Sequence, residues 1–185
     1  RKVNEQASLC KMVDRSSLEE VLLITDRGYE GYNLLAHVQE KGWKFLIRVK
    51  DIHTIGGFTS GLTLPDTGEF DLYIDLSLTT KASKDIKELC KDRNRYRYIP
   101  PTTTFDFLPK KNRKYQPAVF YKLPFRIVRF KITDDTYETV VTNLDAHNFP
   151  ADELKKLYNM RWGIETSFRE LKYTVGLLHF HAKKV

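Results

Sequence analysis

Four side chains suited to phosphate chemistry follow one another at regular intervals near the end of the sequence. Tyr158, Arg161, Glu165 and Lys172 are separated by three, four and seven residues. With 100° of rotation per helical residue, they share an arc of roughly 60° along about 21 Å of helix. Guanidinium and ammonium groups bind phosphate, and a carboxylate is a ligand that Mg²⁺ prefers. The spacing therefore predicts a helix face that presents a phenol, a guanidinium, a carboxylate and an ammonium group in one row.

The same row also has a purely structural interpretation. Arg161 and Glu165 form an ordinary i,i+4 pair, worth about 0.2–0.5 kcal/mol on an exposed helix face. The apolar residues of this stretch gather on a separate stripe, as in any helix that packs on a core. They are Leu157, Ile164, Phe168, Leu171, Val175 and Leu178. Geometry alone leaves both interpretations open.

The helix that carries this row has recognisable ends. Pro150 suits a first helical turn, and Asp152 and Glu153 complement the positive end of the helix dipole. Gly176 is a residue type that commonly ends a helix. One long helix is therefore expected between these limits.

A further carboxylate, Asp26, follows the apolar run 18–24, which predicts a buried strand. A helix is expected over 33–41, with Asn33 as its N-cap and Gly42 at its C-terminal end, and a strand over 44–49. Such a unit favours two parallel strands with a right-handed crossover. Asp26 would then lie at the carboxyl edge of the sheet, where open α/β sheets bind ligands. Taken alone, Asp26 is equally a turn residue or a salt-bridge partner.

The middle of the sequence has a different character. Short β-type runs at 70–76, 118–123, 125–132 and 137–141 are separated by turn clusters, and the last two are expected to form a hairpin across 133–136. A short helix is expected within 81–89. The fold class is thus α/β, with a core at 1–50 and 143–185 and a mostly antiparallel, basic β insertion at 51–142.

The net charge of +7 is concentrated in this insertion. Residues 81–131 contain fifteen Lys and Arg and only four acids, which indicates a polyanionic partner or simply a solvated surface. Aromatic residues such as Tyr96 and Tyr121 alternate with these cations, a pattern typical of a groove along a nucleic-acid strand but also of half-buried hairpins.

Other function classes are excluded or disfavoured. No apolar run approaches the roughly 18 residues of a membrane span. Cys10 and Cys90 lie far apart without neighbouring His or Cys, so reduced thiols in a cytosolic protein are expected rather than a disulfide or zinc site. The sequence starts at Arg1 rather than Met, which suggests a piece of a longer protein.

The string Tyr158-x2-Arg161-x3-Glu165-x6-Lys172, with the flanking segments 161–165 and 168–172, resembles the signature of insertion-sequence transposases of the DDE superfamily. Asp26-Arg27-Gly28-Tyr29 after a predicted strand resembles the same family, and the resemblance covers nearly the whole chain. It implies a ribonuclease-H-like fold and cut-and-paste DNA transposition by phosphodiester hydrolysis and strand transfer. Three acids would hold two Mg²⁺ ions, with Mn²⁺ able to substitute.

The resemblance also implies roles for individual residues. Asp26 and Glu165 would be the second and third catalytic acids and metal ligands. Tyr158, Arg161 and Lys172 would contact DNA phosphates. Apart from the resemblance, the residue type of Trp162 allows it either to stack on a base, as a DNA-binding residue, or to pack in the core. The expected partners are transposon ends and target DNA, with no membrane. A homodimer is expected in the DNA-bound complex, in the bacterial cytoplasm and nucleoid.

The sequence departs from the family at the first acid. Residues 1–20 offer only Glu5, Asp14, Glu19 and Glu20, none within a strand-like run. We therefore expect the first Asp and the early strands to lie outside this chain, so that the full-length protein is an enzyme and this fragment alone is inactive. Two alternatives stay open: a transposase-derived DNA-binding protein without catalysis, and a ribonuclease-H-like nuclease without strand transfer.

Overall fold

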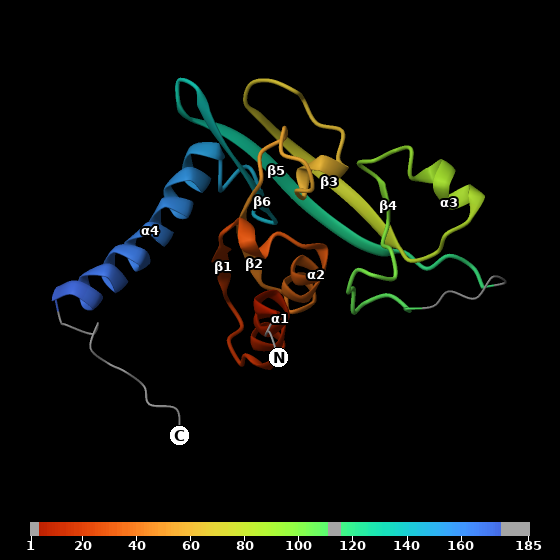
Figure 1. The fold of residues 1–185 in the computed structure, drawn as a ribbon, viewed down its shortest axis with the longest axis horizontal. Coiled ribbons are helices and arrows are strands. Elements are labelled where there is room, and N and C mark those ends of the chain that lie inside the picture. Colours follow the sequence, from red (N-terminus) through yellow and green to blue (C-terminus); the bar gives the residue numbers. More distant parts are fainter. Residues whose placement is uncertain (1–3, 111–115, 175–185) are drawn as a thin grey trace.

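The computed structural model describes residues 4–110 and 116–174, with only the backbone at position 162 and positions 164–174. In this part, six strands form one sheet in the order β1-β2-β6-β5-β3-β4 (Figure 1). The strands are β1 (Leu22–Thr25), β2 (Lys44–Val49), β3 (Phe70–Thr79), β4 (Tyr96–Tyr98), β5 (Tyr121–Thr133) and β6 (Thr136–Thr142). The helices are α1 (Glu5–Arg15), α2 (Tyr32–Glu40), α3 (Lys84–Leu89) and α4 (Ala151–Thr174), with 3-10 turns η1 (Arg27–Tyr29) and η2 (Thr59–Gly61).

The expected strand–helix–strand unit is present. Strands β1 and β2 are parallel neighbours, with Leu22 opposite Lys44 and Thr25 opposite Ile47, and α2 connects them. Gly42 has a φ of 74°, the left-handed conformation that ends α2. The unit places the ends of β1 and β2 at the same edge of the sheet.

The ends of these elements differ from the sequence prediction. Strand β1 begins at Leu22, and Leu18 is 62% exposed, with its carbonyl accepting a hydrogen bond from Trp43 Nε1. Gly31, not Asn33, is the N-cap of α2. The Asn33 carboxamide instead bonds Asp106, accepting from its backbone N–H and donating to its carboxylate. A tertiary contact has replaced the expected local cap.

The insertion strands extend the same sheet instead of forming a separate one. Strand β6 pairs antiparallel with β2, and β5 pairs with both β6 and β3. The two runs expected at 118–123 and 125–132 are one strand through Pro124, which a sheet tolerates because β6 pairs with β5 only from Arg126 onward. The hairpin across 133–136 is confirmed. The division of the chain at 51–142 stays a proposal.

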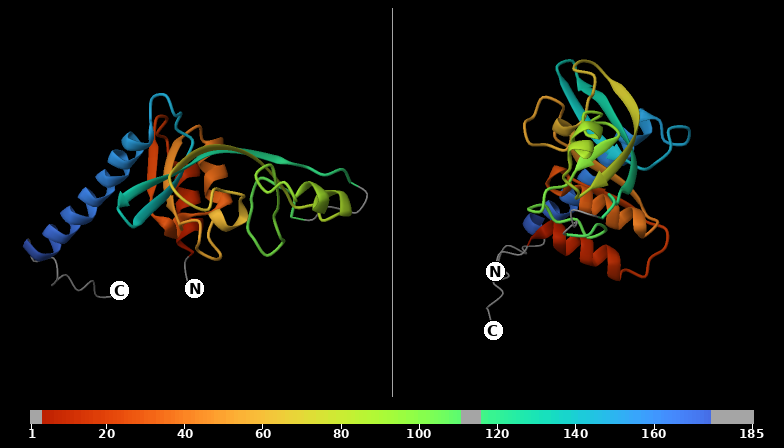
Figure 2. Two further views of the ribbon diagram at one scale, coloured as in Figure 1. Left: turned by 90° about the horizontal axis from the view of Figure 1, so that it is seen from above. Right: turned by 90° about the vertical axis from the view of Figure 1, so that its right-hand side faces the viewer.

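The two faces of the sheet are covered by different helices. Along β2, Phe45, Ile47 and Val49 belong to the core that includes α1 and α2, whereas Leu46 belongs to a second core with Leu154 and Tyr158 of α4. This alternation follows from the two-residue period of a strand. In Figure 2, α4 lies at one end of the molecule and the arm with α3 and β4 extends at the other.

Two arginines of the basic segment are buried in β5. Arg126 is 0% exposed, bonds both carboxylate oxygens of Asp71 and donates to the Phe149 carbonyl at 2.6 Å. Arg129 is 5% exposed, contacts Asp51 through two nitrogens at 2.8 Å and lies 3.9 Å from the centre of the Tyr137 ring. Burial opposes the charge on Asp51, but hydrogen bonds from Arg129 and Thr139 lower its pKa to about 2.

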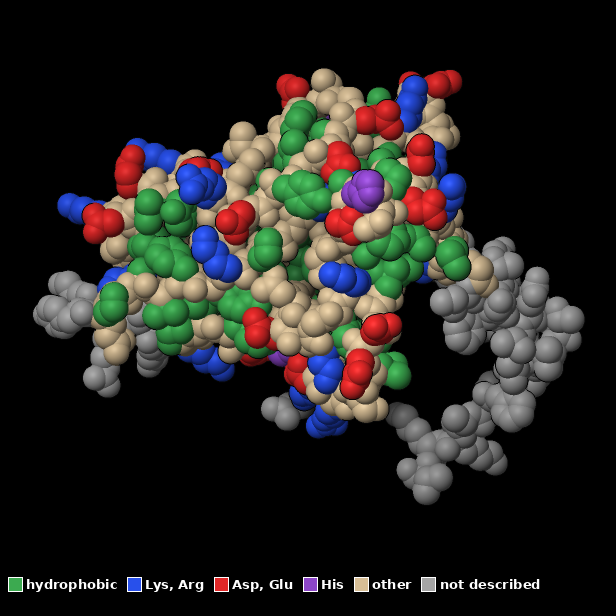
Figure 3. Space-filling model, turned by 180° about the vertical axis from the view of Figure 1, so that it is seen from behind, with side chains coloured by type: hydrophobic (Ala, Val, Ile, Leu, Met, Phe, Trp, Pro, Cys, Tyr) green, Lys and Arg blue, Asp and Glu red, His purple; other side chains and the backbone are tan. Residues whose placement is uncertain are grey.

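These two side chains therefore add nothing to a basic surface. On the face seen in Figure 3, basic, acidic and hydrophobic side chains are interspersed, and charges are not sorted by sign. The local excess of cations in the sequence overstates the positive charge that the folded protein presents.

A buried histidine joins the insertion to α1 and α2. His37 is 8% exposed, with Nδ1 at 2.7 Å from Asp14 and Nε2 at 3.0 Å from Asp106. Burial disfavours the charged ring, but hydrogen bonds and charge from Asp106 and Asp14 outweigh burial and raise the pKa of His37. Because both ring nitrogens face carboxylates, the imidazolium form satisfies both contacts.

A pH-dependent contribution to stability follows. Because the folded-state pKa of His37 is raised, its contribution is complete below its ordinary pKa of about 6.5 and disappears as pH rises through the raised value. We expect His37→Gln to lower the free energy of unfolding by about 1 kcal/mol near pH 6 and by much less near pH 9. Urea unfolding of both proteins at the two pH values measures this, and a difference independent of pH would contradict it.

Candidate active site

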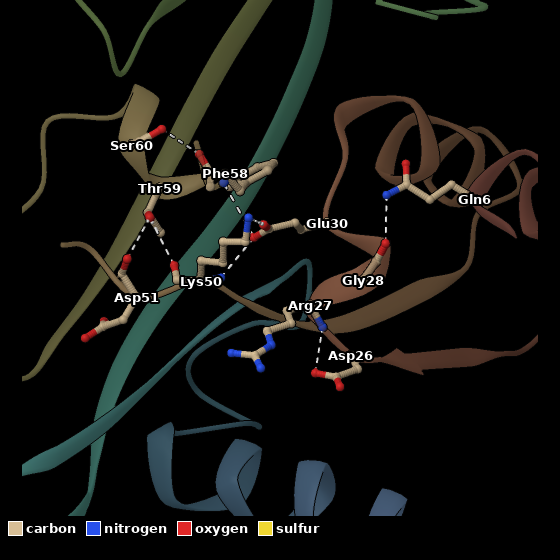
Figure 4. A network of polar contacts seen from close by, with 11 residues as sticks. Gln6, Asp26, Arg27, Gly28, Glu30, Lys50, Asp51, Phe58, Thr59 and Ser60 are labelled. Atoms are coloured by element: carbon tan, nitrogen blue, oxygen red, sulfur yellow. Dashed lines mark hydrogen bonds and ion pairs between the residues drawn. The ribbon is translucent and has the colours of Figure 1, made fainter. Parts of the chain in front are cut away.

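Asp26 occupies the carboxyl end of β1, as predicted. It is half-buried and caps η1, with Oδ1 accepting the Arg27 N–H at 2.7 Å. The Asp26 carbonyl accepts from Tyr29 N–H at 3.0 Å, which closes the turn. Figure 4 shows the carboxylate directed toward the side of the sheet on which α4 lies. A local turn thus sets its direction.

Helix α4 starts directly after Pro150, as expected. Its first half is fixed by Leu154 and Tyr158, both 0% exposed in the core beside Leu46. The bond from Arg126 to the Phe149 carbonyl fixes the residues just before the helix. These contacts place α4 against the end of β1.

Tyr158 connects α4 to Asp26. Its hydroxyl donates to Asp26 Oδ1 across 3.4 Å, and Arg161 lies over its ring, with the guanidinium carbon 5.4 Å from the centroid. Burial first, and the Asp26 charge second, raise the pKa of Tyr158, while the positive charge of Arg161 acts in the opposite direction. The structure thus brings Asp26, Tyr158 and Arg161 together. The Tyr158 side chain is fully buried, so it is a core residue as well.

The other predicted residues of α4 are described only in part. Trp162, Glu165 and Lys172 lie on the helix, but their side chains are outside the described ones. Glu165 follows Tyr158 by seven residues, which is close to two helical turns and nearly the same face. The convergence of the Asp26 and Glu165 carboxylates stays a prediction.

Arg48 is a site residue that the sequence interpretation missed. It lies on β2 two residues after Leu46, so it faces α4, and it forms an ion pair with Glu138 at 3.2 Å. It also acts to lower the pKa of Tyr158. The two-residue alternation of the predicted strand 44–49 contained this signal, because Leu46 and Arg48 must share a face.

Asp26 is suited to a divalent metal. Within the described ranges, Oδ1 takes the hydrogen bonds from Arg27 and Tyr158, and no hydrogen bond to Oδ2 is found. A half-buried carboxylate with one open oxygen is the hard ligand that Mg²⁺ prefers. No group of three or more His, Cys, Asp or Glu gathers among the described residues.

A comparison with protein families decides the assignment. The family described as transposase DDE domain matches residues 1–185. The chain belongs to this DDE transposase family. No curated protein matches it. The family resemblance that the motif indicated is thereby confirmed.

The fold of this DDE transposase domain is mixed α/β and ribonuclease-H-like, as the resemblance implied. Asp26 lies directly after β1, at the carboxyl edge where open α/β sheets bind ligands. None of the helices in the described ranges is long and apolar enough to cross a membrane.

The burial of Tyr158 can be tested by stability. Tyr158→Ala removes a fully buried ring, so we expect a loss of roughly 3–5 kcal/mol in the free energy of unfolding. Tyr158→Phe removes only the hydroxyl, and we expect a loss of about 1 kcal/mol. The neighbouring exposed Asn159 provides the control, since Asn159→Ala should change stability by less than about 0.5 kcal/mol. Chemical denaturation measures all three, and a stable Tyr158→Ala would contradict the burial.

Proposed function

We propose that this DDE transposase domain carries two of the three metal-binding acids, Asp26 and Glu165, of a Mg²⁺-dependent enzyme. The enzyme cleaves DNA at transposon ends and joins them to target DNA. The contact between Tyr158 and Asp26 is the observation that supports this most, because it docks the helix bearing Glu165 against the end of β1. The spacing of Tyr158 and Glu165 then puts both on one face of α4.

The chemistry divides between metal and protein. Two Mg²⁺ ions, when bound, stabilise the attacking and leaving oxygens of an in-line displacement at phosphorus. Asp26 supplies carboxylate oxygens, and its contacts with Arg27 and Tyr158 fix the direction of the group. Arg161 and Lys172 supply cations for the DNA backbone, Arg through a planar fork and Lys through a point charge. Mn²⁺ can replace Mg²⁺ in the same ligand set.

The first acid, in this proposal, lies outside the chain, and the isolated domain is inactive. The complete protein acts on DNA in the bacterial cytoplasm and nucleoid, as a homodimer that holds two transposon ends. Water attacks first and releases a 3′-hydroxyl, which then attacks target DNA.

Glu165→Gln in the full-length protein tests the proposal. The amide keeps the size of the side chain but removes its charge, so we expect cleavage in Mg²⁺ to fall at least roughly 100-fold, with DNA binding nearly unchanged. The substrate is a duplex containing the DNA that flanks the gene, and cleavage is followed on a denaturing gel. Glu170→Gln, about 120° away around the helix from Tyr158, is the matched control and should cleave normally.

The same assay separates the alternatives. Normal cleavage by Glu165→Gln would contradict its assignment. A wild-type protein that binds the duplex without cleaving it would be the non-catalytic DNA-binding protein. Cleavage without joining to a supercoiled target plasmid would indicate a nuclease that lacks strand transfer.

A further inference from the structure

A small recess lies beside Asp26, at the point where β2 ends and β6 begins. Its volume is about 210 Å³. Arg27 lines it from η1, Arg48 and Lys50 from the end of β2, and Tyr137 and Glu138 from β6. In Figure 4, the Arg27 side chain points away from the Asp26 carboxylate and toward the side of Asp51, which also lines the recess. Asp26 thus directs its carboxylate toward α4, while the next residue, Arg27, directs its guanidinium into the adjoining recess.

The charges in this recess are nearly all compensated. Arg48 pairs with Glu138 at 3.2 Å, and Lys50 lies 3.8 Å from Glu30. The Asp51 carboxylate is occupied by the buried Arg129 behind it. These acids are therefore not available as partners for another cation.

Arg27 is the exception. Its side chain is exposed, and no ion pair or side-chain hydrogen bond of its guanidinium is found among the residues that the structure describes. Its backbone is fixed by the Asp26 cap and by the Glu30 N–H, which bonds the Arg27 carbonyl. The recess therefore presents one uncompensated guanidinium on a firmly positioned turn.

The size and charge of the recess select its ligand. Sites for drug-sized molecules measure roughly 300–1,000 Å³, so this recess suits a single small anionic group. A guanidinium offers a planar pair of donors that matches two phosphate oxygens. The position next to Asp26 makes a phosphate of the same DNA strand the natural occupant.

We propose that this recess binds one backbone phosphate of the DNA strand that reacts at Asp26, and that Arg27 is its main contact. The inference rests on the proposed function, because it takes DNA as the ligand. It adds a positioning contact outside the Tyr158–Lys172 row: with the neighbouring phosphate fixed, the reacting phosphodiester is oriented over the metal ligands.

Binding measurements in full-length protein test this contact. The probe is a duplex carrying the DNA that flanks the gene, with Ca²⁺ in place of Mg²⁺ to limit cleavage, titrated between about 50 and 200 mM KCl. We expect Arg27→Gln to weaken binding about 10-fold at the lower salt concentration and to reduce the slope of log K against log salt by about 0.9. Arg27→Lys should keep the slope and lose only part of the affinity, because the charge stays but the planar fork is lost.

Lys11→Gln is the matched control. Lys11 is exposed on α1, outside the recess, and its replacement by Gln removes the same unit of positive charge as Arg27→Gln. A general electrostatic effect would make Lys11→Gln and Arg27→Gln equivalent, and that result would overturn the proposal. Thermal unfolding of each variant should match the wild type, since both side chains are exposed.

Duplexes with a single neutral methylphosphonate, moved stepwise along the strand near the cleavage position, identify the phosphate itself. At one position, we expect the neutral linkage to weaken wild-type binding about 10-fold and to leave Arg27→Gln unaffected. If no position shows this coupling, the recess binds no phosphate, while cleavage by the wild type would still uphold the proposed function. A wild type that neither binds nor cleaves the unmodified duplex would instead refute the proposed function.

Discussion

Two arginines buried in β5 hold together the segments on which the site depends. Arg126 joins β5 to Asp71 of β3 and to the Phe149 carbonyl just before α4, and Arg129 joins β5 to Asp51 just after β2. Removing one partner of a fully buried ion pair leaves an uncompensated charge and lowers the free energy of unfolding by about 3–5 kcal/mol. The loss is smaller where the acid reaches solvent, as Asp71 does. The paired arginines therefore fix to the sheet the segment just before α4 and the segment just after β2.

The alternation of side chains along β2 then determines which residues face α4 and the end of β1. Its two-residue period sends Phe45 and Ile47 toward α1 and α2, and Leu46 and Arg48 toward α4. Tyr158 packs in the same core as Leu46 and reaches Asp26 at the end of the neighbouring strand. A phenol that is fully buried yet bonded to a carboxylate satisfies its hydroxyl and removes conformational freedom from that carboxylate. Packing of the core and orientation of the Asp26 carboxylate thus depend on the same residue.

Much of this arrangement could be predicted from the sequence, because it is local. The parallel unit around α2, the β5–β6 hairpin and the left-handed Gly42 follow from patterns within a few residues. The spaced motif on α4 and the string after β1 identified the family. The structure then differed wherever a distant partner competed with a local one: Asn33 bonds Asp106 instead of capping α2.

The same competition explains why counting charges was a poor guide to the surface. The sequence places fifteen cations within 81–131, yet two of them, Arg126 and Arg129, are buried against acids that lie elsewhere in the chain. Beside Asp26 the count is also misleading, since Arg48 and Lys50 are paired with Glu138 and Glu30. The electrostatic character of a site is set by the charges left over after pairing, and pairing between segments is decided by the fold. In the recess beside Asp26, among the described side chains, that remainder is the guanidinium of Arg27, so the charge that this recess offers to a ligand cannot be read from the basic composition of the domain.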